Sequence, residues 1–243
     1  MDEHATPARL YLFAATQGTM PGPNGPIEMV AGSYLVTMSD GSQVLIDSGP
    51  PAEMGGGSMA GVKVVTATEQ LAKLGIRPED VAMVVTTHFD VDHAGQNDAF
   101  PNAVHVVQKE HLDVARSGHQ RFAGHRAQWD VGDERFRTVE GDTRLFAGFE
   151  LLSTPGHVPG HQSVLLRLPR TGPVLITSDA VPQASLFNPD RPKSRVDSGE
   201  VEELRESTQK LLRVRDQEGV KLVIHHHDGS QWKRLKLAPE YYH

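Results

Sequence analysis

The sequence contains no cysteine among its 243 residues. This absence excludes disulfide bonds, thiolate metal ligands and a cysteine nucleophile, so a metal site would have to use histidine and carboxylate side chains. The sequence also lacks an apolar run near the roughly 18 residues that a transmembrane helix requires. The N-terminal segment 1–6 is acidic and polar rather than basic and then apolar, which argues against a signal peptide and predicts a cytoplasmic location.

Positive charge is in the minority, with 24 lysines and arginines against 31 aspartates and glutamates and a net charge of -7. This balance disfavours nucleic acids and anionic membranes as partners, so a small-molecule substrate is expected. The length suits one large domain or two small ones. No internal repeat or low-complexity linker is present, and the tract Gly55-Gly56-Gly57 is too short for a domain boundary and predicts a loop. We therefore expect a single domain over residues 1–243.

Apolar runs and turn residues predict alternating strands and helices. The expected strands cover 9–16, 33–38, 43–47, 81–86, 103–108, 143–147, 149–153, 163–168, 173–177 and 220–224. Helices are expected over 66–74, 109–112 and 197–214, the last with Asp197 as its capping residue. Residues 117–138 are polar but contain large aromatic side chains, and we expect them to form a partly helical flap near the mouth of a site.

The densest group of polar residues is the segment Thr87-His88-Phe89-Asp90-Val91-Asp92-His93-Ala94-Gly95. It directly follows the apolar run 81–85, at the end of a predicted buried strand. Alternate side chains of an extended chain point the same way, which would direct His88, Asp90 and Asp92 to one side, with His93 following at the turn. Ligands gathered this closely are costly to desolvate without a cation, and they suit zinc, manganese or iron. The alternative is a polar loop that caps the strand.

Three later segments present similar residues in the same way. These segments are Thr154-Pro155-Gly156-His157, Thr177-Ser178-Asp179-Ala180 and His225-His226-His227-Asp228. Each follows a predicted strand, and strands that present polar residues at one edge of a sheet can build a single site from distant parts of the chain. The agreement among four segments predicts a metal site more strongly than any one of them.

This order of segments resembles the metallo-β-lactamase-fold hydrolases and, within them, the N-acyl-homoserine lactonase group. The likeness covers most of the chain and includes Val44-Leu45-Ile46-Asp47-Ser48-Gly49, His93-Ala94-Gly95-Gln96-Asn97, Thr154-Pro155-Gly156-His157-Val158-Pro159-Gly160-His161 and Pro239-Glu240-Tyr241-Tyr242. It implies an α/β fold in the form of a four-layer αββα metallo-β-lactamase sandwich, with two sheets packed together and helices outside. It also implies two divalent metal ions, zinc in the first instance, and is compatible with a homodimer.

The resemblance assigns the metal ligands residue by residue. They are His88, Asp90 and His157 for one metal, Asp92, His93 and His227 for the second, and Asp179 as a bridge between the two. Asp90 departs from most of the family, which has histidine at that position. An anionic oxygen ligand favours manganese, iron or cobalt over zinc. The alternative is that Asp90 binds no metal.

Three consecutive histidines near the C-terminus compete for one ligand position. The family pattern places the ligand directly before an aspartate, which selects His227. Strand alternation would put His225 on the same side in a supporting role, and would turn His226 toward the core or solvent. His161 resembles a framework residue that orients its neighbours by hydrogen bonding. The other histidines match no motif and are expected to be structural or on the surface.

The implied reaction is the opening of a lactone, similar to an N-acyl homoserine lactone, by a hydroxide that bridges the two metals. The expected catalytic carboxylates are Asp92 and Asp179, with Asp179 moving a proton. The homoserine lactonases carry a tyrosine three residues after the bridging aspartate, where this chain has Pro182. The alternatives are an esterase or phosphotriesterase on the same dinuclear site, an iron-dependent redox enzyme suggested by Asp90, and a binding protein without catalysis.

Overall fold

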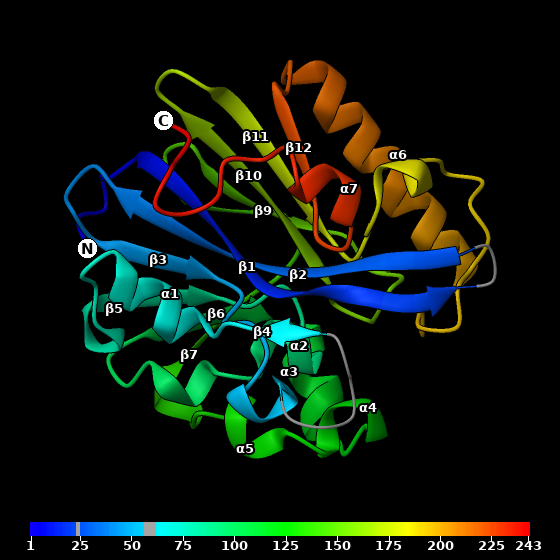
Figure 1. Cartoon of the computed structure of the whole chain (residues 1–243), viewed down its shortest axis with the longest axis horizontal. Helices are drawn as coiled ribbons and strands as arrows, with labels where there is room; N and C mark the ends of the chain where they lie inside the picture. The colour runs from blue at the N-terminus through cyan, green and yellow to red at the C-terminus, as the bar shows by residue number, and fades with distance from the viewer. Residues whose placement is uncertain (23–24, 56–61) are drawn as a thin grey trace.

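The computed structural model describes residues 1–22, 25–55 and 62–243 (Figure 1). The strands are β1 (Pro7–Gly22), β2 (Gly25–Met38), β3 (Gln43–Ile46), β4 (Lys63–Val64), β5 (Val81–Val85), β6 (Val104–Gln108), β7 (Phe136–Val139), β8 (Thr143–Phe146), β9 (Phe149–Ser153), β10 (Gln162–Leu168), β11 (Gly172–Ser178) and β12 (Leu222–His225). The α-helices are α1 (Ala67–Lys73), α2 (Val91–Ala94), α3 (Lys109–Arg116), α4 (Gln120–Ala123), α5 (Arg126–Trp129), α6 (Val201–Gln217) and α7 (Gly229–Trp232). The loop expected at Gly55-Gly56-Gly57 lies largely outside the described residues.

Two sheets form the centre of the molecule, and each is built from one continuous half of the chain. The first has seven strands in the order β4-β1-β2-β3-β5-β6-β7, and the second has five in the order β12-β11-β10-β9-β8. Strands β3, β5, β6 and β7 pair in parallel, as do β11 and β12, whereas the other pairs are antiparallel. The crossover between the sheets is the short connection at residues 140–142.

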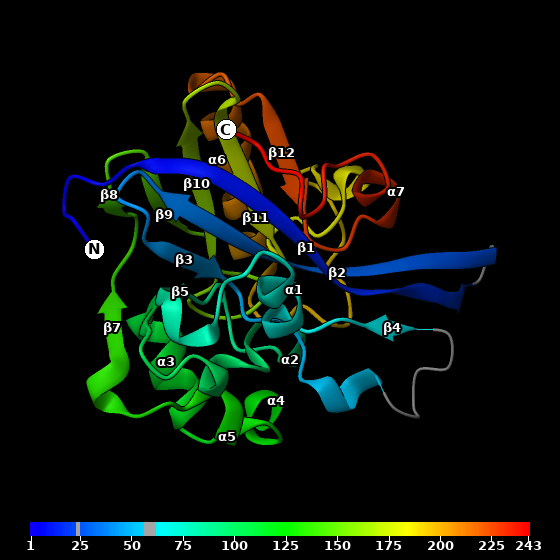
Figure 2. The same cartoon turned by 60° about the vertical axis from the view of Figure 1, so that its left-hand side comes forward.

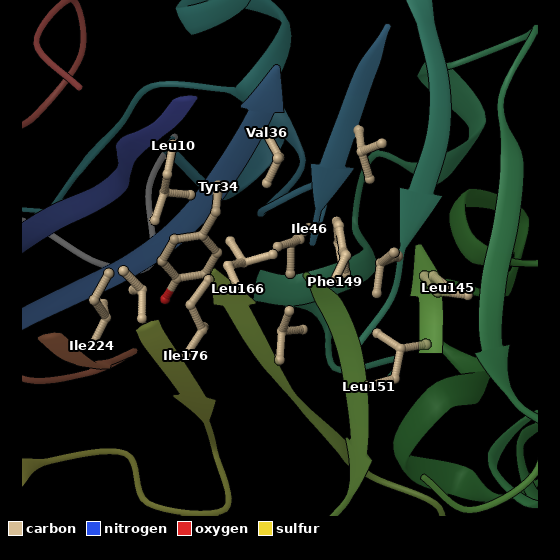
Figure 3. Close-up of a cluster of buried hydrophobic side chains, with 14 of the residues drawn as sticks. Leu10, Tyr34, Val36, Ile46, Leu145, Phe149, Leu151, Leu166, Ile176 and Ile224 are labelled. Carbon is tan, nitrogen blue, oxygen red and sulfur yellow. The ribbon is translucent and has the colours of Figure 1, made fainter. Parts of the chain in front are cut away.

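An apolar core fills the space between the two sheets (Figure 3). On β2, Tyr34 and Val36 point into this core, while Leu35 between them packs on the outer face with Leu71 of α1. The alternation follows from the pleat, which sends successive side chains to opposite faces of a strand. Both sheets contribute to this one core, and the single domain over residues 1–243 stays a prediction.

Helices cover the outer faces of both sheets (Figure 1). Helix α6 lies against the second sheet, where Leu211 packs with Leu165 and Leu175, and helices α1 and α3–α5 lie on the side of the first sheet (Figures 1 and 2). The layers are therefore helix, sheet, sheet and helix, which confirms the expected αββα sandwich. Among the described residues, no helix combines the length and apolar character needed to cross a membrane.

The ribbon of β1 and β2 and the start of helix α6 differ from the sequence prediction. Strands were expected at 9–16 and 33–38, but β1 and β2 are longer and stay paired from Pro7↔Met38 to Gly22↔Gly25, as a ribbon that extends beyond the sandwich (Figure 2). Helix α6 begins at Val201 rather than near Asp197, because Glu200 is its N-cap and forms a capping box with Glu203. The α1 prediction is confirmed, with Thr66 and Glu69 as a capping box.

The strands that precede the candidate ligands end at one edge of the sandwich. In the second sheet, β9 and β11 are both antiparallel to β10, and β12 is parallel to β11, so all three run in the same direction. Across the sandwich, Thr87 after β5 accepts the backbone N–H of Gln162 and the hydroxyl of Ser178, at 3.2 and 3.0 Å. These contacts bring the end of β5 next to the second sheet, so the segments expected to form one site lie together.

Candidate metal centre

The loop after β5 is held by two histidines that the sequence left without a role. His111 accepts the backbone N–H of Phe89 at 2.8 Å, and His125 contacts the carbonyl of the same residue at 2.6 Å. These bonds satisfy the backbone of a buried residue between His88 and Asp90. Asp90 is then the N-cap of α2, a four-residue helix that carries the next two candidate ligands. The contacts to Phe89 and the helix α2 therefore fix the backbone on both sides of Asp90.

A glycine shapes the loop that carries His157. Gly156 has a φ of +126°, and a Cβ at this position would lie 2.6 Å from the backbone nitrogen of Leu204 at the start of α6. A side chain would meet backbone there, in a conformation that only glycine adopts readily. This close approach lets His157, a buried residue, project from the end of β9 toward the metal centre.

Asp179 is positioned by its backbone. Ser178, the last residue of β11, has a φ of +48°, which is uncommon for a residue other than glycine. The N–H of Asp179 then donates to Nε2 of His161 at 3.2 Å, and His161 contacts Thr154 through Nδ1 at 2.9 Å. The expectation that His161 orients a neighbour by hydrogen bonding is confirmed.

Four histidines direct Nε2 toward one carboxylate. Oδ2 of Asp179 lies 3.9 Å from Nε2 of His88 and 3.4 Å from Nε2 of His157. Oδ1 of the same carboxylate lies 3.6 Å from Nε2 of His93 and 3.4 Å from Nε2 of His227. Each carboxylate oxygen therefore faces a different pair of histidines, which is the arrangement that a bridging ligand requires.

The remaining two carboxylates divide the site into two groups. Oδ2 of Asp90 lies 3.2 Å from Nε2 of both His88 and His157. Oδ2 of Asp92 lies 3.5 Å from Nε2 of His227 and 3.9 Å from that of His93. Within each group, one ligand atom per residue lies within 4.8 Å of the others. The first group is His88, Asp90, His157 and Asp179, and the second group is Asp92, His93, His226 and His227.

The opposite nitrogen of each inward-facing ring is held by the protein. Nδ1 of His93 donates to Asp47 at 2.8 Å, that of His157 lies 3.1 Å from Asp197, and that of His227 contacts the carbonyl of Val30 at 2.7 Å. Nδ1 of His88 contacts the hydroxyl of Thr87 at 3.1 Å. Such partners fix the tautomer that leaves Nε2 free to bind a metal. Asp47, Asp197 and Val30 were not predicted as parts of the site.

The terminal histidines follow the sequence prediction only in part. Strand β12 ends at His225, so alternation does not continue through the next two residues. The prediction that His225 lies beside His227 is wrong, because its ring bonds instead to Val181 and Thr177. His226 is buried and stacks on His93, with ring centroids 3.9 Å apart.

Of the adjacent histidines His226 and His227, which both belong to the second group, His226 is already engaged by the protein. Its Nε2 accepts the backbone N–H of Gly32 at 3.3 Å, and its Nδ1 lies 3.4 Å from the hydroxyl of Tyr34. In His227, Nδ1 bonds to the backbone carbonyl of Val30, and Nε2 faces the carboxylates of Asp92 and Asp179. The geometry therefore favours His227 as the ligand, as the sequence pattern did.

The charges in the site favour a cation. Burial lowers the pKa of His227, but the negative charge of Asp179, the hydrogen bond to it and the negative charge of Asp92 together outweigh burial and raise this pKa to about 9. Burial likewise raises the pKa of Asp179, yet the neighbouring positive charges of His227 and His93 hold it well below its usual range. The carboxylates thus favour positive charge on His227, and a metal ion supplies the same positive charge.

Three buried atoms in the site have no hydrogen-bond partner among the described residues, namely Nε2 of His88, Nε2 of His93 and Oδ1 of Asp179. Buried polar atoms are rarely left without a partner. All three point to where the two groups meet, and together they offer the nitrogen and oxygen donors that divalent metals bind. The donor set therefore fits a pair of divalent ions.

One cation of the protein itself lies in the first group. Arg121 of α4 donates to both carboxylate oxygens of Asp90 and to Nε2 of His157. Arg121 therefore places part of the segment 117–138 beside the site, and the flap itself stays a prediction. Arg121 could not be predicted from the sequence, because an arginine 31 residues away from its carboxylate partner belongs to no local pattern.

Comparison with known proteins agrees with this geometry. A family model described as the metallo-beta-lactamase superfamily matches residues 30–237. An N-acyl homoserine lactonase from Bacillus sp is 30% identical over 232 residues, which cover 90% of this chain and 89% of that protein. The N-acyl homoserine lactonase AttM from Azorhizobium caulinodans is 37% identical over 186 residues, which cover 71% of this chain and 68% of that protein.

Solved structures give the same result. An N-acyl homoserine lactone hydrolase with the product N-hexanoyl-L-homoserine bound at its catalytic metal centre has a TM-score of 0.82 and 25% identity to this chain. The match covers 98% of this chain and 100% of that one. The chain belongs to the metallo-beta-lactamase superfamily. Within that superfamily it is a member of the N-acyl homoserine lactonase family, since the 30% identity to the Bacillus relative extends over nearly the full length of both proteins.

Proposed function

We propose that the chain is a dinuclear metal-dependent hydrolase that opens the ring of an N-acyl homoserine lactone. The observation that carries the proposal is the position of Asp179, whose two oxygens face the Nε2 atoms of two different pairs of histidines. Its relatives act on homoserine lactones, and this arrangement suits the two ions of such a centre. In the proposal the ligands are those assigned from the sequence: His88, Asp90 and His157; Asp92, His93 and His227; and the bridging Asp179.

The metal ions would supply the nucleophile and the electrophile. When bound, two divalent ions lower the pKa of a water between them toward ~7 and polarise the carbonyl of the substrate. Water then adds to the lactone carbonyl carbon, and the ring C–O bond breaks. The ring oxygen leaves as an alkoxide and must take up a proton. The product is a hydroxy acid.

Asp179 is the proposed carrier of that proton. Its carboxylate lies between the two groups, where each oxygen of the anion faces one of them and can accept a proton from the attacking water. Delivery of the proton to the ring oxygen restores the ionised form. Asp92 is the second catalytic carboxylate in this proposal. Its side chain is 26% exposed, against 7% for Asp179, so it lies at the solvent side of the centre.

The residue that bonds the substrate carbonyl in the lactonase group is not matched by a side chain here. Pro182 stands in its place and uses its own carbonyl to accept the N–H of His227 at 2.9 Å. Tyr34 does not replace the missing hydroxyl, because it is fully buried between the sheets. Polarisation of the carbonyl therefore falls to the metal ions in this proposal, and turnover of homoserine lactones should be slower than is usual for the group.

The metal preference of the proposed centre follows from Asp90. A carboxylate ligand in place of a histidine favours manganese, iron or cobalt over zinc. We further propose a cytoplasmic location and a homodimer in solution, by resemblance to the family. Light scattering combined with size-exclusion chromatography measures the assembly state directly.

The proposal is tested with protein loaded separately with zinc, manganese, cobalt and iron(II), after chelation and dialysis. Elemental analysis should approach two ions per chain. Proton release should then be measured on N-acyl homoserine lactones of short and long acyl chains, a simple lactone, an aryl ester and a phosphotriester. We expect the homoserine lactones to give the highest kcat/KM, with manganese, cobalt or iron above zinc.

The control is Asp179→Asn, which should retain the fold but lose turnover of every substrate. Faster hydrolysis of the aryl ester or the phosphotriester would replace the lactonase proposal by the corresponding activity. A chain that binds iron with redox-active spectra and hydrolyses none of these substrates would overturn it in favour of a redox enzyme. A metal content of one or none would overturn the dinuclear centre.

A further inference from the structure

The guanidinium of Arg121 lies at the two atoms that a metal in the first group would use. Its Nε donates to Oδ1 of Asp90 at 2.5 Å, and one terminal nitrogen contacts Oδ2 of the same carboxylate. That terminal nitrogen also lies 2.8 Å from Nε2 of His157. Because Nδ1 of His157 faces Asp197, its Nε2 is free to accept. Arg121 thus engages both an oxygen donor and a nitrogen donor of the first group.

This contact differs from an ordinary surface ion pair. The side chain of Asp90 is 16% exposed, that of Arg121 is 21% exposed, and that of His157 is 3% exposed. Two parallel bonds from an arginine to a carboxylate form one of the stronger charge-assisted arrangements in proteins. Removing such a pair therefore requires a comparably strong interaction in its place.

The second group has no equivalent cation. In the part of the chain that the structure describes, neither Asp92 of the second group nor Asp179, which faces both groups, forms an ion pair with an arginine or a lysine. Their ion-pair partners are histidines, which are themselves candidate metal ligands rather than fixed cations. The two groups thus differ in one respect that affects metal binding, because only the first contains a permanent positive charge.

We propose that Arg121 is a built-in competitor for the first metal position, so that the two metal ions bind this chain with unequal affinity. An ion can engage Asp90 and His157 together only after the guanidinium leaves them. The second group should therefore fill first and the first group only at higher metal concentration. The inference rests on the proposed assignment of these residues as metal ligands.

A second position near Val196 is available to the Arg121 side chain if a metal ion displaces it. Its other terminal nitrogen donates to the carbonyl of Val196, near the surface, and its side chain is already partly exposed. The residue belongs to α4, a four-residue helix in the segment 117–138 beside the site. A rotation of the side chain toward Val196 and solvent would free Asp90 without moving the ligands themselves.

The test is metal titration of metal-free protein with Mn²⁺, Co²⁺ and Zn²⁺, using calorimetry and a competing chromophoric chelator. The wild-type chain should show two steps, separated by about tenfold or more in Kd. In Arg121→Met, which keeps an unbranched side chain but removes the guanidinium with its charge and its donors, the weaker step should tighten by at least about tenfold, the equivalent of about 1.4 kcal/mol. The tighter step should be unchanged. The absorption of Co²⁺ reports each step without any assay of activity.

Arg126→Ala is the matched control, because Arg126 lies on the same segment and pairs with Asp130 away from the metal centre. It should leave both steps unchanged. Arg121→Lys retains the charge with fewer bonds and should give an intermediate Kd, which keeps the test decisive if Arg121→Met is unstable. The inference would be overturned if Arg121→Met bound metal at the first group with unchanged or lower affinity. A wild-type chain that binds no metal would overturn the proposed function instead.

Discussion

The carboxylate of Asp197 lies 3.1 Å from Nδ1 of His157, on the side of the ring that faces away from the metal centre. It is held there by Arg191 at 3.1 Å and by the backbone N–H of Ser194 at 2.8 Å. The carboxylate can only accept from Nδ1, so it selects the tautomer whose Nε2 carries a free lone pair. Asp197 is thus a positioning residue for the first group.

The variant Asp197→Asn should weaken metal binding at the first group by about 10- to 100-fold, the usual effect of removing such a partner. The amide can donate to Nδ1 and thereby favour the tautomer with a proton on Nε2. Calorimetric titration of metal-free protein measures the effect. Asp216→Asn, on an exposed residue paired with Arg215, is the control and should bind as the wild type does. Equal metal affinities in the wild type, Asp197→Asn and Asp216→Asn would show that Asp197 does not position His157 for metal binding.

His226 and His227 should respond differently to truncation. His227→Ala removes the ring that faces Asp92 and Asp179, so it should lose one metal ion per chain and nearly all activity. His226→Ala should retain both ions, because the nitrogens of that ring bond to Gly32 and Tyr34. It should nevertheless lower the stability by about 2 kcal/mol or more, since it removes a fully buried ring. Elemental analysis and thermal unfolding separate the two effects; loss of metal from His226→Ala alone would reverse the assignment.

Replacing Asp90 by histidine should alter the metal preference in a way that depends on Arg121. Asp90→His introduces the nitrogen ligand typical of the family and should move the preference from manganese toward zinc. It also leaves the guanidinium without its carboxylate partner, next to a position that would hold another cation. We therefore expect the double variant Asp90→His/Arg121→Met to bind zinc more tightly than Asp90→His alone. Competition titrations with both metals measure this, and an unaltered preference in the double variant would show that Asp90 is not a ligand.

Pro182→Tyr tests whether the missing hydroxyl limits turnover. The backbone carbonyl that accepts the N–H of His227 remains after the substitution, and Pro182 is only half-buried, so the fold should tolerate the change. A hydrogen bond to the developing oxyanion could raise kcat by up to about 10²–10³-fold. Ala184→Tyr, on an exposed residue nearby, is the control and should have no such effect. Steady-state kinetics with N-hexanoyl homoserine lactone measure both, and a slower Pro182→Tyr would show that carbonyl polarisation is already complete.

His105 should contribute an acid sensitivity that is separate from the metal centre. Burial lowers the pKa of this ring from 6.5 to about 3. Between these values the unfolded chain binds a proton that the folded chain does not, so stability falls as the pH is lowered through this window. At pH 5 the loss is about 2 kcal/mol.

The variant His105→Leu should remove this part of the acid sensitivity. Urea unfolding at pH 7 and pH 5 should give a smaller difference than in the wild type. His4→Leu, at an exposed histidine, should leave the pH dependence unchanged. If His105→Leu kept the wild-type difference in unfolding free energy between pH 7 and pH 5, the ring would have to be already charged or solvated in the folded chain.

The sequence predicted those parts of the fold that have local causes. Helix α1 begins where Thr66 and Glu69 form a capping box, and the candidate ligands follow strand ends, where polar residues interrupt apolar runs. By contrast, the long ribbon of β1 and β2 could not be predicted, because glycine and proline residues near its tip are typical of loops. Its pairing depends on register rather than on residue type.

The residues of the candidate site likewise differ in how far the sequence predicts them. The seven candidate ligands could be predicted because each belongs to a short pattern after a strand, and the structure brings them together. The residues that control them do not belong to such patterns. Val30 acts through a backbone carbonyl, which any residue has, and Asp197 resembled the cap of α6 because an aspartate before a helix has that role in many proteins. Only the three-dimensional contacts distinguish such residues.

The division of the two sheets between the two halves of the chain has a consequence for assembly. His88 and Asp90 belong to the first half, whereas His157, Asp179 and His227 belong to the second, so ions bound here would act as a non-covalent cross-link between them. The connection at 140–142 is short and lies between the sheets. If the chain were interrupted there, the two fragments should reassociate more tightly with metal than without it.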